Sequence, residues 1–169
     1  LDEAIEHLED ARTICKTQGD RFNEYLTNEY LTVVEVEREN FPSALQHAET
    51  LVEIGSRLRE GSEYPFALAI RALCHCGLQE ETPDIEDQLA AVRQADAKQR
   101  LAYLLNRLAI LDIGQGNHQL ALRRSEEALE LARLMERPTE TLMAHINLIN
   151  ILNFISDLES KPHVESALE

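Results

Sequence analysis

The sequence predicts an all-α protein built as a solenoid of antiparallel helix pairs. Three observations lead to this fold class. Leu, Ala, Glu and Arg dominate the composition, whereas Gly, Pro and aromatic residues are few. Apolar residues recur at helical spacing, and no useful length alternates with the period of two that is typical of a strand. A similar pattern of small residues also returns at intervals of about 40 residues.

Turn residues divide the chain at regular intervals. Pro42, Pro65, Pro83, Pro138 and Pro162 are each expected to start a helix, because the missing N–H of proline has no partner in a first turn anyway. Short turns between the segments predict that neighbouring helices are antiparallel. We expect helices over residues 1–18, 20–38, 42–60, 64–79, 83–95, 97–114, 118–136, 138–157 and from 162 onward.

The repeat is seen at the start of every second helix. Ala4, Ala44, Ile85 and Ala121 occupy similar points, at steps of 40, 41 and 36 residues. A period of this length indicates stacked helix pairs, because no single pair can bury its own apolar face. The prediction is one domain over residues 1–169, with about four helix pairs and a partial one.

Small residues stand where two paired helices must approach. Ala109 on one helix and Ala121 and Ala128 on the next allow the axes to come within roughly 8–10 Å. Leu105 and Leu108 would fill the rest of the contact. This order of large, large and small residues, followed by two small residues seven apart, resembles the tetratricopeptide repeat.

The chain departs from the usual tetratricopeptide pattern at several positions. Asp112 and Ser125 stand where that family places aromatic residues, and the repeats are longer than its standard of about 34 residues. Long, degenerate repeats of this kind are similar to those of bacterial multidomain regulators. The resemblance implies a right-handed superhelix in which the first helix of each pair lines an inner groove.

The resemblance also implies where a protein or peptide would bind. The groove-facing positions of the clearest repeat are Tyr103, Asn106 and Ile110, and the earlier repeat offers Leu26, Glu29 and Val33 at the same offset. An exposed Tyr and Asn among apolar groups suit a peptide. The alternative is that the three aliphatic residues only contact the next helix.

The charge of the chain disfavours nucleic acid as a partner. The net charge is −15, and residues 1–95 hold 8 Lys and Arg against 20 Asp and Glu. Such a field repels phosphate groups.

The sequence also indicates where the protein is located. No apolar run reaches the roughly 18 residues of a membrane span, and three widely spaced Cys fit reduced thiols in a cytoplasm. A soluble, cytoplasmic protein that binds no membrane is therefore expected.

The sequence Cys74-His75-Cys76 is the stretch that most resembles a chemical site. On one helix the two thiols point about 200° apart, so they do not converge on a metal ion. Cys74 is expected to pack as a small core residue. A metal ligand and a reactive thiol are the alternatives. The remaining His residues are expected at surfaces or helix starts, and phosphate-loop, HExxH and EF-hand patterns are absent. We therefore expect no enzyme activity and no cofactor.

The last long helix is apolar around much of its circumference. Residues 141–155 read TLMAHINLINILNFI. One side can pack on the preceding helix, and the remainder forms a candidate association patch with Met143, Ile149 and Leu152. Self-association or partner binding through this helix is expected. The alternative is that one chain buries all of its apolar side chains.

Together these observations favour a non-catalytic module that binds protein or peptide. By resemblance, it would be the sensor region of a bacterial signalling or regulatory protein, next to an effector such as a cyclase, a diguanylate cyclase or a transcription activator. Self-association is the first alternative, and a thiol sensor or enzyme using Cys74 is the second. The chain begins with Leu, and residues 161–169 look like the opening of another helix. It is therefore expected to be a piece of a longer protein.

Overall fold

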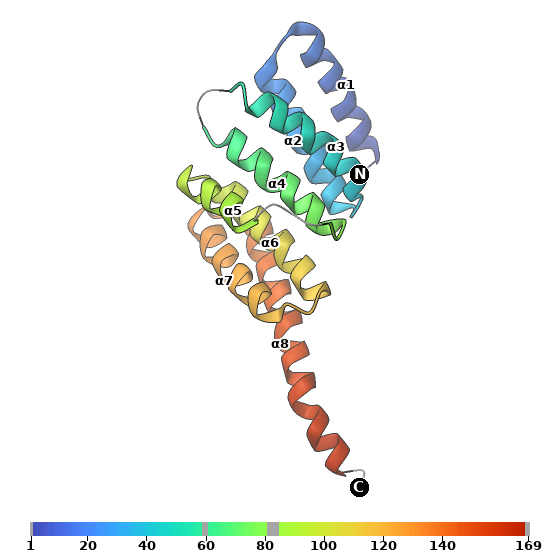
Figure 1. The fold of residues 1–169 in the computed structure, drawn as a ribbon, viewed down its shortest axis with the longest axis vertical. Helices are drawn as coiled ribbons and strands as arrows, with labels where there is room; N and C mark the ends of the chain where they lie inside the picture. The colour runs from blue at the N-terminus through green and yellow to red at the C-terminus, as the bar shows by residue number, and fades with distance from the viewer. Residues whose placement is uncertain (1, 59–60, 81–84, 168–169) are drawn as a thin grey trace. The chain divides into compact units, whose positions relative to one another are not determined.

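Helices form all the regular secondary structure in the part of the chain that the structure describes. The computed structural model describes the backbone of residues 2–58, 61–80 and 85–167, and the side chains of these residues except 155 and 157–167. Eight helices lie in these ranges (Figure 1). They form two compact units, Leu1–Ala97 and Lys98–Glu169.

The first unit contains five helices. They are α1 (Asp2–Gln18), α2 (Arg21–Glu37), α3 (Phe41–Gly55), α4 (Glu63–Gly77) and α5 (Ile85–Gln94). Each helix packs on the one before it. The contact between α3 and α4 is close at one end, where a Cβ added to Gly77 would lie 2.4 Å from the ring of Phe41. The Tyr25 hydroxyl of α2 also donates to the Glu63 carbonyl at the start of α4, over 2.6 Å.

The second unit contains three helices. They are α6 (Lys98–Gly114), α7 (His118–Leu134) and α8 (Pro138–Ala167). Here α7 packs on α6, and α8 packs on both. Ala109 of α6, Ala121 of α7 and Ile151 of α8 are fully buried in one cluster. Ala128 is fully buried as well. The prediction that small residues close the contact between α6 and α7 is therefore confirmed.

One turn geometry recurs between helices. A residue one or two positions past the helix end adopts a positive φ, and the next residue donates its N–H to the carbonyl five positions back. This arrangement satisfies a carbonyl that a helix end otherwise leaves without a partner. The donors are Asp20, Asn40, Glu80, Ala97, Asn117 and Arg137, over 2.8–3.4 Å. Most of them are separated by 20 residues or by a multiple of 20, which gives the repeat a physical basis in the backbone.

Two helix boundaries in the structure differ from those predicted. Pro162 was expected to start a ninth helix after residue 157, but α8 continues through it to Ala167. This expectation is wrong because proline removes only one backbone hydrogen bond, and the residues around it contain no Gly that would end the helix. The helix expected over residues 42–60 ends at Gly55. Pro83 lies outside the described residues, whereas Pro42 and Pro138 lie in first turns as expected.

Gly116 tests the recurring turn. Its φ is +78°, and a Cβ there would meet no atom within 4 Å, so Gly116→Ala introduces backbone strain without a clash. We expect the substitution to lower the free energy of unfolding by about 1 kcal/mol. Gly114 is a matched control, because it is helical and equally open. Gly114→Ala should be neutral or stabilising in the same chemical denaturation experiment, and equal effects would contradict the turn geometry.

Ala128 tests the packing of α6 on α7. Because its side chain is fully buried, Ala128→Leu should overpack the contact and cost roughly 1–3 kcal/mol of stability. Glu130 lies exposed on the same helix, and Glu130→Leu should change stability by less than about 0.5 kcal/mol. An unchanged denaturation midpoint for Ala128→Leu would show that α6 and α7 do not meet at this residue.

Candidate functional site

The start of α8 is fixed by the turn that precedes it. Glu136 has a φ of +51°, and the Arg137 N–H donates to the Ala132 carbonyl over 2.8 Å. Pro138 is the first residue of α8, where its fixed φ suits a helix. The Arg137 carbonyl then accepts both the N–H and the hydroxyl of Thr141, each over 2.9 Å. These bonds determine where the helix begins.

One side of α8 is held against α6 by buried polar groups. The Asn106 amide of α6 donates to the Glu140 carbonyl and to its Oε2, each over 3.0 Å. The Asn147 amide of α8 donates in return to the Asn106 carbonyl over 3.1 Å. Both Asn side chains are buried. Asn147 forms the inner face of α8 together with Ala144 and Ile151, and the three bonds fix the rotation of the helix about its own axis.

The opposite side of α8 carries large apolar side chains that are exposed in the part of the chain that the structure describes. We call Leu142, Ile146, Ile149 and Leu152 the outer stripe. These side chains are 62%, 42%, 55% and 58% exposed. At about 100° per residue they fall within a sector of roughly 120°, opposite the inner face. Isolated apolar residues are normal on a protein surface, but a contiguous stripe on one helix is typical of an interaction site.

The outer stripe lies in a stretch without formal charge. Residues 141–156 contain no Asp, Glu, Lys or Arg, although the chain as a whole has a net charge of −15. A surface that covers the stripe therefore leaves no charged group of this stretch desolvated and unpaired, which would be costly.

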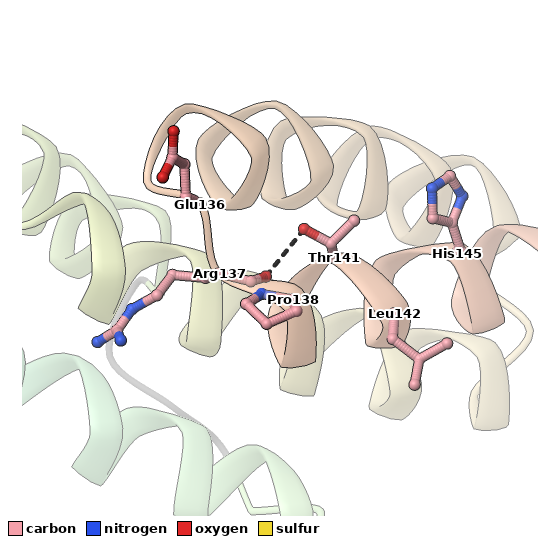
Figure 2. A pocket seen from close by; sticks show the side chains of 6 residues that line it. All are labelled: Glu136, Arg137, Pro138, Thr141, Leu142 and His145. Atoms are coloured by element: carbon pink, nitrogen blue, oxygen red, sulfur yellow. Dashed lines mark hydrogen bonds between the residues drawn. The ribbon is translucent and has the colours of Figure 1, made fainter.

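A hollow lies at the start of the outer stripe. It has a volume of about 580 Å³ and is lined by the turn before α8 and by its first turns. Figure 2 shows the lining side chains, with the Thr141 hydroxyl bonded to the Arg137 carbonyl. Leu142 belongs both to the hollow and to the stripe. The lining residues are Glu136, Arg137, Pro138, Thr141, Leu142 and His145.

The predicted association patch agrees with the outer stripe only in part. Ile149 and Leu152 are exposed on it. Met143 is half-buried and lies about 120° around the helix from Ile149, so it is not part of the outer stripe, and its role in association stays a prediction. Leu142 and Ile146 take its place. Helical geometry, at about 100° per residue, separates Met143 from Ile149 only once the side of α8 that faces α6 is known.

The predicted groove residues have mixed surroundings. Asn106 was expected to be exposed, and this is wrong, because its amide is buried by the bonds to Glu140. Tyr103 is half-buried, with the Arg107 guanidinium 5.6 Å from its ring centre. Ile110 in the second unit, and Leu26, Glu29 and Val33 in the first, are also half-buried. Their role as partner contacts stays a prediction.

The two departures from the tetratricopeptide pattern are buried polar groups. Asp112 Oδ2 accepts from Arg124 Nη1 over 2.6 Å, and both side chains are about nine-tenths buried or more. The Ser125 hydroxyl donates to the Ala121 carbonyl over 2.8 Å. An ion pair thus joins α6 to α7. Removing one partner from such a pair leaves a buried charge uncompensated.

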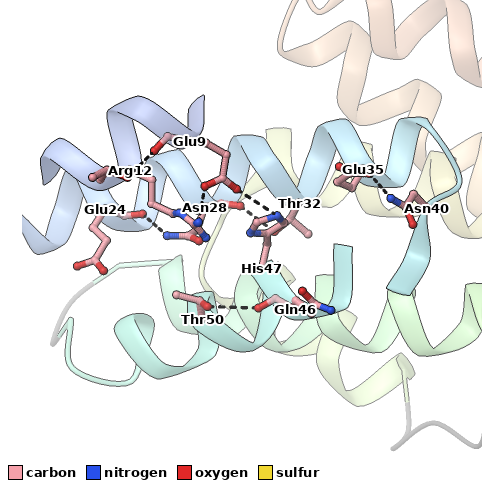
Figure 3. A network of polar contacts seen from close by, with 11 residues as sticks. Glu9, Arg12, Glu24, Asn28, Thr32, Glu35, Asn40, Gln46, His47 and Thr50 are labelled. Carbon is pink, nitrogen blue, oxygen red and sulfur yellow. Dashed lines mark hydrogen bonds and ion pairs between the residues drawn. The ribbon is translucent and has the colours of Figure 1, made fainter. Parts of the chain in front are cut away.

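The first unit contains a polar network between α1, α2 and α3 (Figure 3). His47 of α3 was expected at the surface, but it is buried and lies 3.9 Å from the Glu9 carboxylate of α1. Burial lowers the pKa of His47, and the neighbouring Arg12 lowers it further, whereas Glu9 and Glu35 oppose this change. Some residues of the network also line a pocket of about 390 Å³. The lining residues are Arg12, Thr13, Lys16, Thr17, Glu24, Asn28 and Thr50.

Cys74 is buried in α4, as expected for a packing residue. Burial raises the pKa of its thiol to about 12, and the nearby Cys76 contributes to the rise. A thiol with this pKa is protonated at neutral pH and is a poor nucleophile. His75 bonds instead to Glu80, over 2.7 Å. Among the described residues no group of three or more His, Cys, Asp or Glu side chains is arranged to hold a metal ion.

Comparisons with known proteins give no match. None of the protein-family models, curated proteins or solved structures searched is similar to this chain at a significant level. Within the described residues, no helix has both the length and the apolar character needed to cross a membrane. In the part that the structure describes, the chain belongs to the all-helical class, with consecutive helices packed within each unit. The surfaces of these helices are the basis for a functional proposal.

Thiol labelling tests the account of Cys74. In the native protein we expect Cys15 and Cys76, which are partly exposed, to react with an aromatic disulfide reagent. The rise of the Cys74 pKa from 9.0 to about 12 should slow its reaction on the order of a thousandfold. Denaturant should release this third thiol, and Cys74→Ala should abolish only that late phase. Rapid labelling of three thiols in the native state would instead favour a thiol sensor.

Proposed function

We propose that this chain is a non-catalytic protein-interaction module that binds a partner helix along the outer stripe of α8. The observation that carries the proposal is the second apolar face of α8. Its inner face is already covered by α6 and α7, so the outer stripe is not needed for the packing of this unit. Four large apolar side chains kept half exposed on one helix are what a helix-binding surface requires.

The chemistry of the outer stripe also defines its partner. The stripe is apolar and its stretch is uncharged, so the matching surface is the apolar face of an amphipathic helix. From Leu142 to Leu152 it extends about 15 Å along the axis, which is close to three turns. The hollow beside Leu142 provides room for one larger anchoring side chain from the partner.

The resemblance to tetratricopeptide repeats extends the proposal. The helix pairs would follow a right-handed superhelix, and the module would belong to a cytoplasmic signalling or regulatory protein in which partner binding controls an effector domain. The recurring turns and the small residues between α6 and α7 support this extension. A thiol-based function receives less support, because Cys74 is buried and protonated. Self-association is the second candidate, because every copy of the chain carries the same stripe.

Site-specific photo-crosslinking in cells tests the proposed function. A photoreactive residue at position 149 should capture a partner, whereas the same residue at Asn150, which is exposed about 100° around the helix, should not. The captured protein is then purified and titrated against the chain. Ile149→Glu should weaken binding at least roughly tenfold, since it places a charge in an apolar contact, and Asn150→Glu should leave it unchanged.

Two outcomes would contradict the proposal. In the first, position 149 crosslinks only to other residues of its own chain, which would mean that the outer stripe is part of an internal core. In the second, Ile149→Glu and Asn150→Glu weaken partner binding equally, which would place the contact on a different surface.

A further inference from the structure

We infer that the partner of the outer stripe is the outer stripe of a second copy, paired antiparallel about a twofold axis at Ile149. This inference rests on the proposed function and names the occupant of the same surface. A twofold dimer uses one patch on both copies, so the patch must be complementary to itself. The sequence of α8 around Ile149 satisfies this condition.

The register that centres on Ile149 pairs like with like. Antiparallel helices in this register bring together residues whose numbers add to 298. Ile149 then faces its own copy, and Ile146 of each chain faces Leu152 of the other, so the three contacts at the centre are aliphatic. His145 faces Asn153 of the other chain, which allows a hydrogen bond at each flank. Both of these polar residues are exposed and lie within the sector of the stripe, between its aliphatic side chains.

A parallel pairing is less favourable. It would place each residue against its own copy, including His145 against His145. In the antiparallel register each imidazole instead meets an amide, which donates or accepts according to the tautomer.

Charge is the main obstacle to association of two copies, and α8 avoids it. Each chain carries a net charge of −15, so most pairs of surfaces from two copies repel each other. Residues 141–156 hold no charged side chain, and the exposed part of α8 is therefore a region where two copies can meet without opposing carboxylates. Added salt should screen the remaining repulsion and strengthen the dimer.

The exposed area fits a weak dimer. Four large side chains that are about half exposed present roughly 400 Å² of apolar surface per copy, so a pair with its polar rim buries about 1,000 Å² in total, at the lower end of specific interfaces. We therefore expect an equilibrium between monomer and dimer that depends on concentration and is observable at micromolar to millimolar concentrations.

Cysteine crosslinking of the full chain tests the register. Cys15 and Cys76 are first changed to serine, so that the buried Cys74 is the only native thiol left. Ile149→Cys should then form a disulfide-linked dimer under mild oxidation, because the two residues meet at the axis. His145→Cys and Asn153→Cys should each crosslink poorly alone but efficiently when mixed.

Sedimentation of the otherwise unmodified chain measures the strength of the association. Ile149→Glu should weaken it roughly hundredfold, because two carboxylates then oppose each other, and Asn150→Glu should leave it unchanged.

Each remaining outcome would overturn the inference. Efficient linkage of His145→Cys to itself would indicate a parallel pair, and a monomer at every concentration would mean that no pair forms. If the chain stays monomeric while position 149 captures a different protein in cells, the self-pairing fails and the proposed function stands. Because Ile149 is 55% exposed, the Glu variant should keep its helical content by circular dichroism, which separates lost association from unfolding.

Discussion

Short turns between helices are the constraint on which the rest of the structure depends. A residue with positive φ reverses the chain within a few residues, and inside each unit every helix packs along the helix before it. Two helices joined in this way can approach only where their side chains are small. Ala109, Ala121 and Ala128 meet that condition in the second unit. The periodic placement of alanine is therefore a consequence of the turns.

The same constraint determines which surface of α8 stays exposed. The turn at Glu136 brings α8 back along α7, and the bonds between Asn106, Glu140 and Asn147 fix its rotation. Ile151 then lies in the core, while Ile149, two residues earlier, is 55% exposed. Buried amide bonds in the interior thus decide which apolar residues a partner can reach. This connects the fold to the proposed function through three hydrogen bonds.

Sequence reasoning predicted the fold more completely than the site. Helical spacing, proline positions and the alanine pattern predicted most of the helices and the contact between α6 and α7, but Pro162 does not start a separate helix. They failed at Asn106, because an amide with local bonding partners can be buried as readily as an apolar residue. They also did not separate Met143 from the outer stripe, because a helix that is apolar around much of its circumference does not indicate which side faces inward. Only the positions of Asn106 and Asn147 supply that direction.

The central claim is that α8 has two apolar faces and that its own chain covers only one. The most direct measurement is methyl NMR of the dilute protein with a soluble nitroxide. The account predicts that the methyl signals of Leu142, Ile146, Ile149 and Leu152 broaden strongly, that Ile151 and Leu108 stay protected, and that the outer signals recover as concentration rises. Protection of the outer signals in the dilute monomer would contradict it, because the stripe would then be buried within the chain.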